Sequence, residues 1–167
     1  MLKKVRLHIT TERRELVGSL FEGDTPKLTL AKVADADVER IEITVDASYH
    51  DDGTRVSMIY HESELTGMAG ATTTLTFQKN EPQLVSMLRH GTVKTALVFE
   101  KGKRHCCVYQ TPIMPFEVCV LTDKVENNIE GTGTLSLSYA VELRGGLAEQ
   151  TRFQLRVLPY FDQPQKH

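Results

Sequence analysis

The sequence lacks any stretch that could cross a membrane as a helix. Such a helix needs about eighteen or more consecutive apolar residues, and no apolar segment of this chain approaches that length. It also lacks an excess of positive charge: 20 Lys and Arg stand against 22 Asp and Glu, for a formal net charge of -2. Proteins that bind nucleic acid depend on a positive field to attract the phosphates. We therefore expect neither a membrane nor a nucleic acid as a partner.

Cysteine is scarce, with 3 residues in a chain of 167. A small and odd number fits a reducing compartment better than a secreted scaffold held by disulfides. The first residues alternate charged and aliphatic side chains, whereas a signal peptide would continue with an apolar segment. Both features predict a cytoplasmic protein.

A helical period of 3.6 residues is absent over any three turns, and apolar residues instead recur at every second position almost from end to end. Val5, Leu7 and Ile9 begin this pattern, and turn signals interrupt it about every eight to twelve residues. Closing such a meander into a barrel removes the unpaired strand edges. The sequence thus predicts an all-β fold, an antiparallel up-and-down meander that forms a β-barrel of about 8–11 strands. An open sandwich is the alternative.

The length and the apolar content of 40% suffice for one substantial core. We expect a single barrel domain over residues 1–158 and a C-terminal tail over residues 159–167. Residues 13–37 fit the strand pattern less well. They are interpreted as an extra hairpin that turns at the Gly-Asp-Thr-Pro stretch starting at Gly23, or as a short helix near Leu30 to Val38, and we prefer the hairpin.

Two cysteines are predicted to face each other across a hairpin. A turn centred between Pro112 and Ile113 pairs Cys106 with Cys119, close enough for a disulfide if they are oxidised. Two buried thiols that pack as small hydrophobic groups are the preferred interpretation. Zinc would need a further ligand, for which His105 is the only nearby candidate, so no metal or other cofactor is predicted.

The same register places three further cross-strand pairs on one face, namely His105 with Val120, Cys107 with Val118, and Tyr109 with Phe116. A three-residue loop after the preceding strand would add Leu97 and Phe99 to this face, which is the expected barrel interior. His105 and Tyr109 would then be polar groups in an enclosed apolar space, as in a small-molecule pocket. The alternative is a core His and Tyr whose hydrogen bonds are satisfied by neighbours.

A carboxylate pair precedes the stretch that contains Gly67 and Gly70. Glu62 and Glu64 are expected on one face of a strand end, where they could act as acid and base together with His61 or His105. A solvated strand end explains them more simply. No nucleophile elbow, phosphate-binding loop or metalloprotease motif occurs, so no catalytic residue is assigned.

Several motifs together resemble one known family. They are Glu62, Glu64 to Gly67, Thr72 to Thr74, Arg89 with Gly91, Phe99 to Gly102 with His105, and Tyr109 with Thr111 and Pro112. As a set they resemble the YwiB-like family of uncharacterised bacterial proteins, over about residues 60–157. The family commonly continues with an aromatic residue and Gly where this chain has Ile113, Met114 and Pro115. The resemblance implies a calycin-like, that is lipocalin-like, barrel and no established activity.

These observations favour a non-enzymatic barrel that binds a small, partly apolar ligand in its interior. The candidate ligand contacts are Arg89, His105 and Tyr109, with Glu62 and Glu64 as further candidates. One alternative is an interaction module that binds another protein without a ligand. The other is a hydrolase or isomerase that uses Glu62 or Glu64 with a His.

Overall fold

A computed structural model describes residues 1–15, 21–22, 25–26, 38–66, 68–143 and 146–160. Ten strands form one sheet: β1 (Leu2–Glu15), β4 (Val38–Asp51), β5 (Arg55–His61), β6 (Thr72–Gln78), β7 (Glu81–His90), β8 (Thr95–Glu100), β9 (Arg104–Gln110), β10 (Pro115–Asn128), β11 (Thr134–Leu143) and β12 (Gly146–Pro159). A 3₁₀ helix spans Glu64–Thr66. The described residues include no helix with the length and apolar character needed to cross a membrane.

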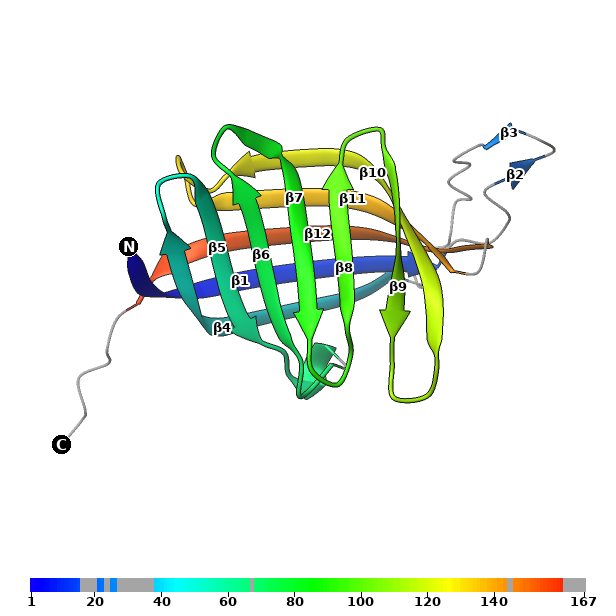
Figure 1. The fold of residues 1–167 in the computed structure, drawn as a ribbon, viewed down its shortest axis with the longest axis horizontal. Helices are drawn as coiled ribbons and strands as arrows, with labels where there is room; N and C mark the ends of the chain where they lie inside the picture. Colours follow the sequence, from blue (N-terminus) through cyan, green and yellow to red (C-terminus); the bar gives the residue numbers. More distant parts are fainter. Residues whose placement is uncertain (16–20, 23–24, 27–37, 67, 144–145, 161–167) are drawn as a thin grey trace.

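The sheet curls into a nearly closed barrel in which all ladders are antiparallel (Figure 1). β1 lies between β4 and β12 and so joins the two ends of the meander. The edge strands β8 and β9 meet at one bridge, where Lys94 N donates to Gln110 O (2.9 Å) and Gln110 N donates to Lys94 O (2.8 Å). The predicted antiparallel up-and-down barrel is confirmed, with closure weakest between β8 and β9.

The core lies between two layers of this barrel, in which β5 to β9 cross β1 and β12 (Figure 1). Alternate side chains of each strand point inward because successive residues of a strand face opposite sides. Val5, Leu7 and Ile9 are accordingly buried on β1. Phe99 of β8 contacts Tyr139 of β11 across the core, with ring centroids 4.6 Å apart. Burial of these apolar side chains is the main force that holds the barrel together.

The predicted register between β9 and β10 is confirmed. Cys106 pairs with Cys119, His105 with Val120, Cys107 with Val118, and Tyr109 with Phe116. Residues 101–103 separate β8 from β9, and Leu97 and Phe99 are buried in the same core as Val118 and Val120. The three-residue loop therefore puts Leu97 and Phe99 on the same interior face as His105, Cys107 and Tyr109, as expected.

The segment from residue 13 to residue 37 is described only in part. Phe21–Glu22 (β2) and Thr25–Pro26 (β3) pair in an antiparallel two-stranded sheet of their own. Residues 27–37 lie outside the described part of the chain, and with them most of the stretch for which a short helix was the alternative. Residues 161–167 of the expected tail lie outside it too.

Two turns pack against each other at one end of the barrel. Gly91, at the β7–β8 turn, lies so close to the loop before β6 that an added Cβ would be 2.3 Å from Gly70 O. Gly91 also has a φ of +135°, which side chains rarely adopt. Thr92 Oγ1 donates to Ala69 O (3.0 Å) across the same contact. These contacts hold the β5–β6 loop, which begins with Glu62, against the turn after β7, the strand that carries Arg89.

We predict that Gly91→Ala lowers the free energy of unfolding by more than about 3 kcal/mol, because a Cβ there clashes with backbone and requires a strained φ. Gly53→Ala is the matched control: Gly53 has a φ of +90° but no atom within 4 Å of an added Cβ. That variant should lose only about 1–2 kcal/mol, the conformational cost alone. Urea unfolding of both variants measures the difference, and equal losses would contradict the tight contact between the two turns.

Candidate functional site

A cavity of about 340 Å³ opens into the barrel interior at the end where the β5–β6 loop and β9 meet the end of β1. Its apolar wall is made by Leu97, Phe116, Val118, Val141 and Leu143. Its polar groups are Arg13, Thr66, Arg89, Tyr109, Tyr139, Glu149 and Thr151, and Met68 completes the lining. An apolar wall with a few polar groups is typical of small-molecule sites, and this volume is at the small end of their range.

A carboxylate is buried beside this cavity. Glu62, 8% exposed, follows directly after β5. Its Oε1 accepts a hydrogen bond from Thr73 Oγ1 (2.6 Å) and its Oε2 accepts one from Thr66 Oγ1 (2.8 Å). Thr73 and Arg89 are cross-strand partners on β6 and β7, and Arg89 Nε lies 3.8 Å from Glu62 Oε1. Three neighbouring segments thus converge on one carboxylate.

Arg89 has hydrogen-bonding capacity that the described residues leave unused. Its side chain is only 12% exposed, and its buried Nε has no hydrogen-bond partner among the described residues. The side chain lines both the main cavity and an adjoining void of about 30 Å³, which is large enough for about one water molecule. A buried donor without a partner is costly, so Arg89 is the group in this site with most to gain from a bound acceptor.

Burial shifts the pKa of two ionisable groups in the cavity lining, Tyr139 and Glu149. Burial raises the pKa of the Tyr139 hydroxyl, and the positive charges of Arg89 and Arg13 oppose that shift. Burial also raises the pKa of the Glu149 carboxyl, against the opposing effect of Arg13. Tyr139 therefore stays a neutral hydroxyl at ordinary pH, and Glu149 keeps its proton to a higher pH than a solvated Glu.

Tyr109 lies where the sequence predicts it, in the wall of the cavity. Its ring stacks on Phe116, with centroids 5.2 Å apart and planes at 19°. Its hydroxyl lies 3.9 Å from Met68 Sδ. The fold thus brings three of the five predicted contact residues together: Tyr109, Arg89 and the adjacent Glu62.

The other two predicted residues lie elsewhere. His105 shares the interior face with Tyr109, but it sits near the β8–β9 turn, where its Nε2 contacts Glu100 Oε1 at 3.1 Å. Glu64 is exposed in the 3₁₀ helix, although Glu62 is buried. The expectation that Glu62 and Glu64 share a face is wrong, because β5 ends at His61 and the alternation of a strand does not continue beyond it.

Among the described residues, the contacts of Glu62 include neither His61 nor His105, the two histidines that the sequence suggested as partners. His61 is exposed and its Nδ1 lies 3.2 Å from Thr72 Oγ1. Glu62 contacts two threonines and Arg89 instead. The geometry required for a hydrolase or isomerase built on Glu62 and a His is therefore not present in these contacts.

Sequence reasoning missed two charged residues of the cavity, Arg13 and Glu149. A signal for Arg13 was present, because Val5, Leu7, Ile9, Thr11 and Arg13 follow one another at every second position and so share the inward face. Glu149 likewise precedes the buried Thr151 and Phe153 at the same spacing on β12. Both Arg13 and Glu149 could have been identified as charged residues that continue a row of inward-facing residues at every second position.

The cysteines differ from the preferred expectation. Cys106 and Cys119 form a disulfide, and Cys106 is exposed, so the prediction of two buried free thiols is wrong. Cys107 is the free cysteine, half-buried on the interior face, with its Sγ 3.4 Å from Thr95 Oγ1. Adjacent cysteines therefore point to opposite faces of the sheet, as predicted for a strand.

A family model for a domain of unknown function, DUF1934, matches residues 28–155. The chain belongs to the DUF1934 family. The crystal structure of the ywiB protein from Bacillus subtilis is similar to this DUF1934 protein, with a TM-score of 0.63 and 16% sequence identity over 93% of this chain and 92% of that one. Together, the two matches confirm the YwiB-like resemblance and the shared fold. Comparison with curated proteins gives no match.

We predict that Glu62→Ala destabilises this DUF1934 protein by about 3–5 kcal/mol, because Arg89 would lose its nearest counter-charge and buried Thr73 its acceptor. Glu64→Ala is the control two residues away; as an exposed side chain it should change the free energy of unfolding by less than about 0.5 kcal/mol. Chemical denaturation measures both values. A loss for Glu62→Ala as small as that of the control would show that the buried pair has little influence on folding.

We also predict that Glu149→Gln stabilises the protein at pH 7. The pKa of Glu149 is raised in the folded state, so its contribution to stability is present below the ordinary pKa of 4.5 and is lost as the pH rises through the folded pKa. The gain should stay below about 1 kcal/mol, since Glu149 is only half-buried. Thermal melts at pH 7 and pH 4 measure it: the difference between variant and wild type should shrink at pH 4. A variant that is less stable at pH 7 would contradict the assigned shift.

Proposed function

We propose that this DUF1934 protein binds a small, partly apolar ligand with an anionic group in the cavity at this end of the barrel. The observation that carries the proposal is that Arg89 lines that cavity while its buried Nε has no hydrogen-bond partner among the described residues. A ligand oxygen that accepts a hydrogen bond from Arg89 would remove the free-energy cost of this buried donor.

The apolar part of the ligand follows from the cavity wall. Val118, Val141 and Leu143 line one side, and the stacked rings of Tyr109 and Phe116 line another. A flat or aliphatic body of a few carbons would bury apolar surface on these groups. The small volume favours a compact ligand over a lipid chain.

The anionic group follows from the charges around Arg89. The two oxygens of Glu62 already accept hydrogen bonds from Thr66 and Thr73, and the contact from Glu62 to Arg89 Nε is 3.8 Å, too long for a hydrogen bond. Arg13 adds a second guanidinium to the lining. Burial holds the pKa of Glu149 above its ordinary value. As the pH falls, Glu149 is therefore protonated earlier than a solvated Glu, and its repulsion of a bound anion decreases. A carboxylate is the simplest group that fits two guanidinium groups.

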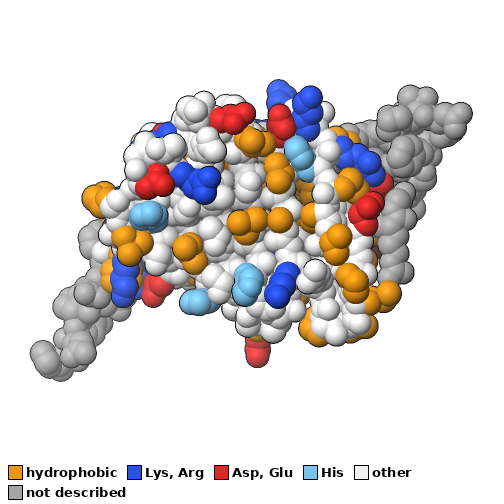
Figure 2. Space-filling model, in the orientation of Figure 1, with side chains coloured by type: hydrophobic (Ala, Val, Ile, Leu, Met, Phe, Trp, Pro, Cys, Tyr) orange, Lys and Arg blue, Asp and Glu red, His pale blue; other side chains and the backbone are white. Residues whose placement is uncertain are grey.

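The outer face supports the alternative of an interaction module less well. Ile59 of β5 and Leu88 of β7 are exposed on the layer formed by β5 to β9, and hydrophobic side chains are visible across this face (Figure 2). The two residues are 40% and 41% exposed, and Thr74 lies between them in the register. Scattered aliphatic groups of this kind are normal on monomeric proteins. The interior cavity is therefore the better candidate.

The test uses a panel of small aromatic acids, namely benzoate, phenylacetate and 3-phenylpropionate, each with its amide. We predict that at least one acid binds, about tenfold or more tightly than its amide, because a charge-assisted hydrogen bond contributes more than a neutral one. Arg89→Gln should abolish this preference, whereas His105→Ala, which changes a side chain outside the cavity lining, should leave it intact. Titration calorimetry or ligand-observed NMR measures the affinities.

Two results would contradict the proposal. One is a panel in which no acid binds with a Kd below about 10 mM. The other is equal binding of acids and amides to the wild type and to Arg89→Gln, which would place the compounds outside the Arg89 site. A folded Arg89→Gln protein, shown by its circular dichroism and unfolding midpoint, is the condition for the comparison.

A further inference from the structure

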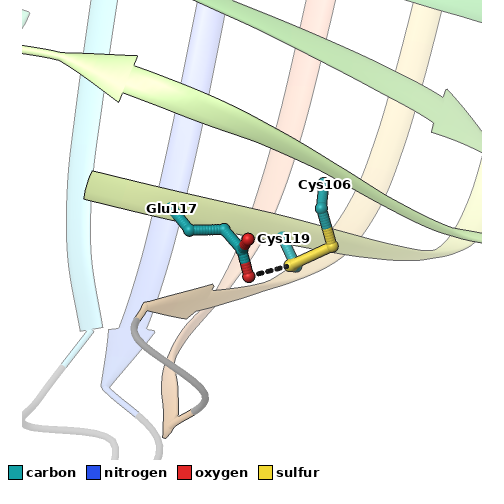
Figure 3. Close-up of side chains that lie close together, drawn as sticks. All are labelled: Cys106, Glu117 and Cys119. Carbon is teal, nitrogen blue, oxygen red and sulfur yellow. Dashed lines mark hydrogen bonds between the residues drawn. A yellow bond between two sulfur atoms is a disulfide. The ribbon is translucent and has the colours of Figure 1, made fainter. Parts of the chain in front are cut away.

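A second cluster of reactive side chains, Cys106, Glu117 and Cys119, lies on β9 and β10 (Figure 3). It is on the opposite face of these strands from the cavity, because Glu117 alternates with the cavity residues Phe116 and Val118. Glu117 and Cys119 are two residues apart on β10 and therefore share a face. Cys106 on β9 is the direct cross-strand partner of Cys119. One ligand atom from each of the three residues lies within 4.8 Å of the others, and Glu117 Oε1 is 3.7 Å from Cys119 Sγ.

We propose that the reduced form of this protein binds one thiophilic divalent cation, of the zinc class, through Cys106, Cys119 and Glu117. Two thiolates and a carboxylate are ligands that zinc accepts, and a water molecule would complete a tetrahedral site. Cys106 and Glu117 are exposed, which gives the cation access, whereas Cys119 is 3% exposed and anchors the site to the sheet. The cation and the disulfide are alternatives, because both use the same two sulfur atoms.

The strand geometry supports this arrangement of ligands. Side chains that face each other directly across an antiparallel pair have Cβ atoms about 4.5–5.5 Å apart. Two thiolates on one tetrahedral zinc lie about 3.8 Å apart, as follows from zinc–sulfur bonds of about 2.3 Å. Rotation about the side-chain bonds of Cys106 and Cys119 is therefore enough to separate the sulfur atoms after reduction. The ligands lie on strands of a sheet, which hold positions more precisely than loops do.

The charges around the cluster favour a cation. Arg104 precedes Cys106 by two residues on the same face, and its Nε and Nη2 donate to both oxygens of Glu142 (3.0 and 2.9 Å). Glu142 is the cross-strand partner of Cys119 on β11. The guanidinium is thus already paired, and in the reduced state the two thiolates and Glu117 add negative charge that is not neutralised by it.

The change between the two states is a thiol–disulfide exchange. A small dithiol reductant attacks the Cys106–Cys119 bond, becomes a cyclic disulfide, and leaves two protein thiols with its two electrons and two protons. Binding of the cation then releases the two thiol protons to solvent. In the reducing cytoplasm that the cysteine content predicts, the dithiol would be the prevailing form.

Sequence reasoning predicted no metal site because it considered only His105 as a further ligand. His105 is on the interior face and contacts Glu100, so it cannot reach the two sulfur atoms on the other side of the sheet. The signal that it missed is the spacing of Glu117 and Cys119, which places a carboxylate beside the cysteine pair.

The test is a titration of the reduced, metal-free protein with Zn²⁺ against a chromophoric chelator, repeated with Co²⁺ to detect thiolate-to-metal charge transfer. We expect one equivalent of metal in the wild type. Cys106→Ser and Cys119→Ser should each weaken binding by about 100-fold or more, and Glu117→Gln by about tenfold. Cys107→Ser is the matched control, since Cys107 points into the barrel, and it should bind as the wild type does.

Oxidation gives a second readout on unmutated protein. Treatment of the zinc-loaded wild type with a small disulfide as oxidant should convert the two cysteine thiolates to the Cys106–Cys119 disulfide and reduce the oxidant to its thiols. The metal should therefore be released in a ratio of about one metal for every two protein thiols lost. The proposal is overturned if the reduced wild type binds no more zinc than Cys106→Ser, if Glu117→Gln binds as tightly as the wild type, or if Cys107→Ser loses binding. Because Glu117→Gln changes an exposed side chain, its result does not depend on whether the cysteine variants fold.

Discussion

Alternation of side chains across a closed sheet is the constraint on which this molecule depends. Each strand must send every second residue inward, whether that residue is apolar or not. Over most of the barrel those residues are aliphatic or aromatic and make the core. Near the end of β1 the inward series continues with Arg13, and at the end of β7 it reaches Arg89. The same rule that builds the core thus places charged groups inside the barrel at one end.

Burial of those inward charges costs free energy, and the contacts among the described residues offset only part of that cost. Glu62 has two hydroxyl donors and a nearby guanidinium, whereas Arg89 Nε has no hydrogen-bond partner among the described residues and burial raises the pKa of Glu149. Natural proteins often accept such costs where a ligand removes them. The close contact between Gly91 and Gly70 keeps the strand ends that carry these groups in place. Stability and the proposed binding are therefore connected through the same few residues.

Alternation also explains what the sequence could predict and where prediction failed. The period of two was enough for the all-β fold and, with a turn centred between Pro112 and Ile113, for the β9–β10 register and the inward position of Tyr109. Arg89 was a candidate contact whose face the period had not been used to assign. The period failed at Glu64, because a 3₁₀ helix replaces the strand there. The partner of His105 depends on where the β8–β9 turn places Glu100, which the period does not determine. The cavity itself arises from strands far apart in the chain, so no local pattern contains it.

The proposed binding depends on Arg89, whose buried Nε has no hydrogen-bond partner among the described residues. The most direct measurement is the NMR resonance of the Arg89 Nε–H group, assigned with Arg89→Gln, during addition of an aromatic carboxylate. We expect a large, saturable shift of this resonance, together with shifts of the resonances of residues around the cavity. If the Arg89 resonance stays constant while surface groups shift, the guanidinium is a structural group only, and the binding account is wrong.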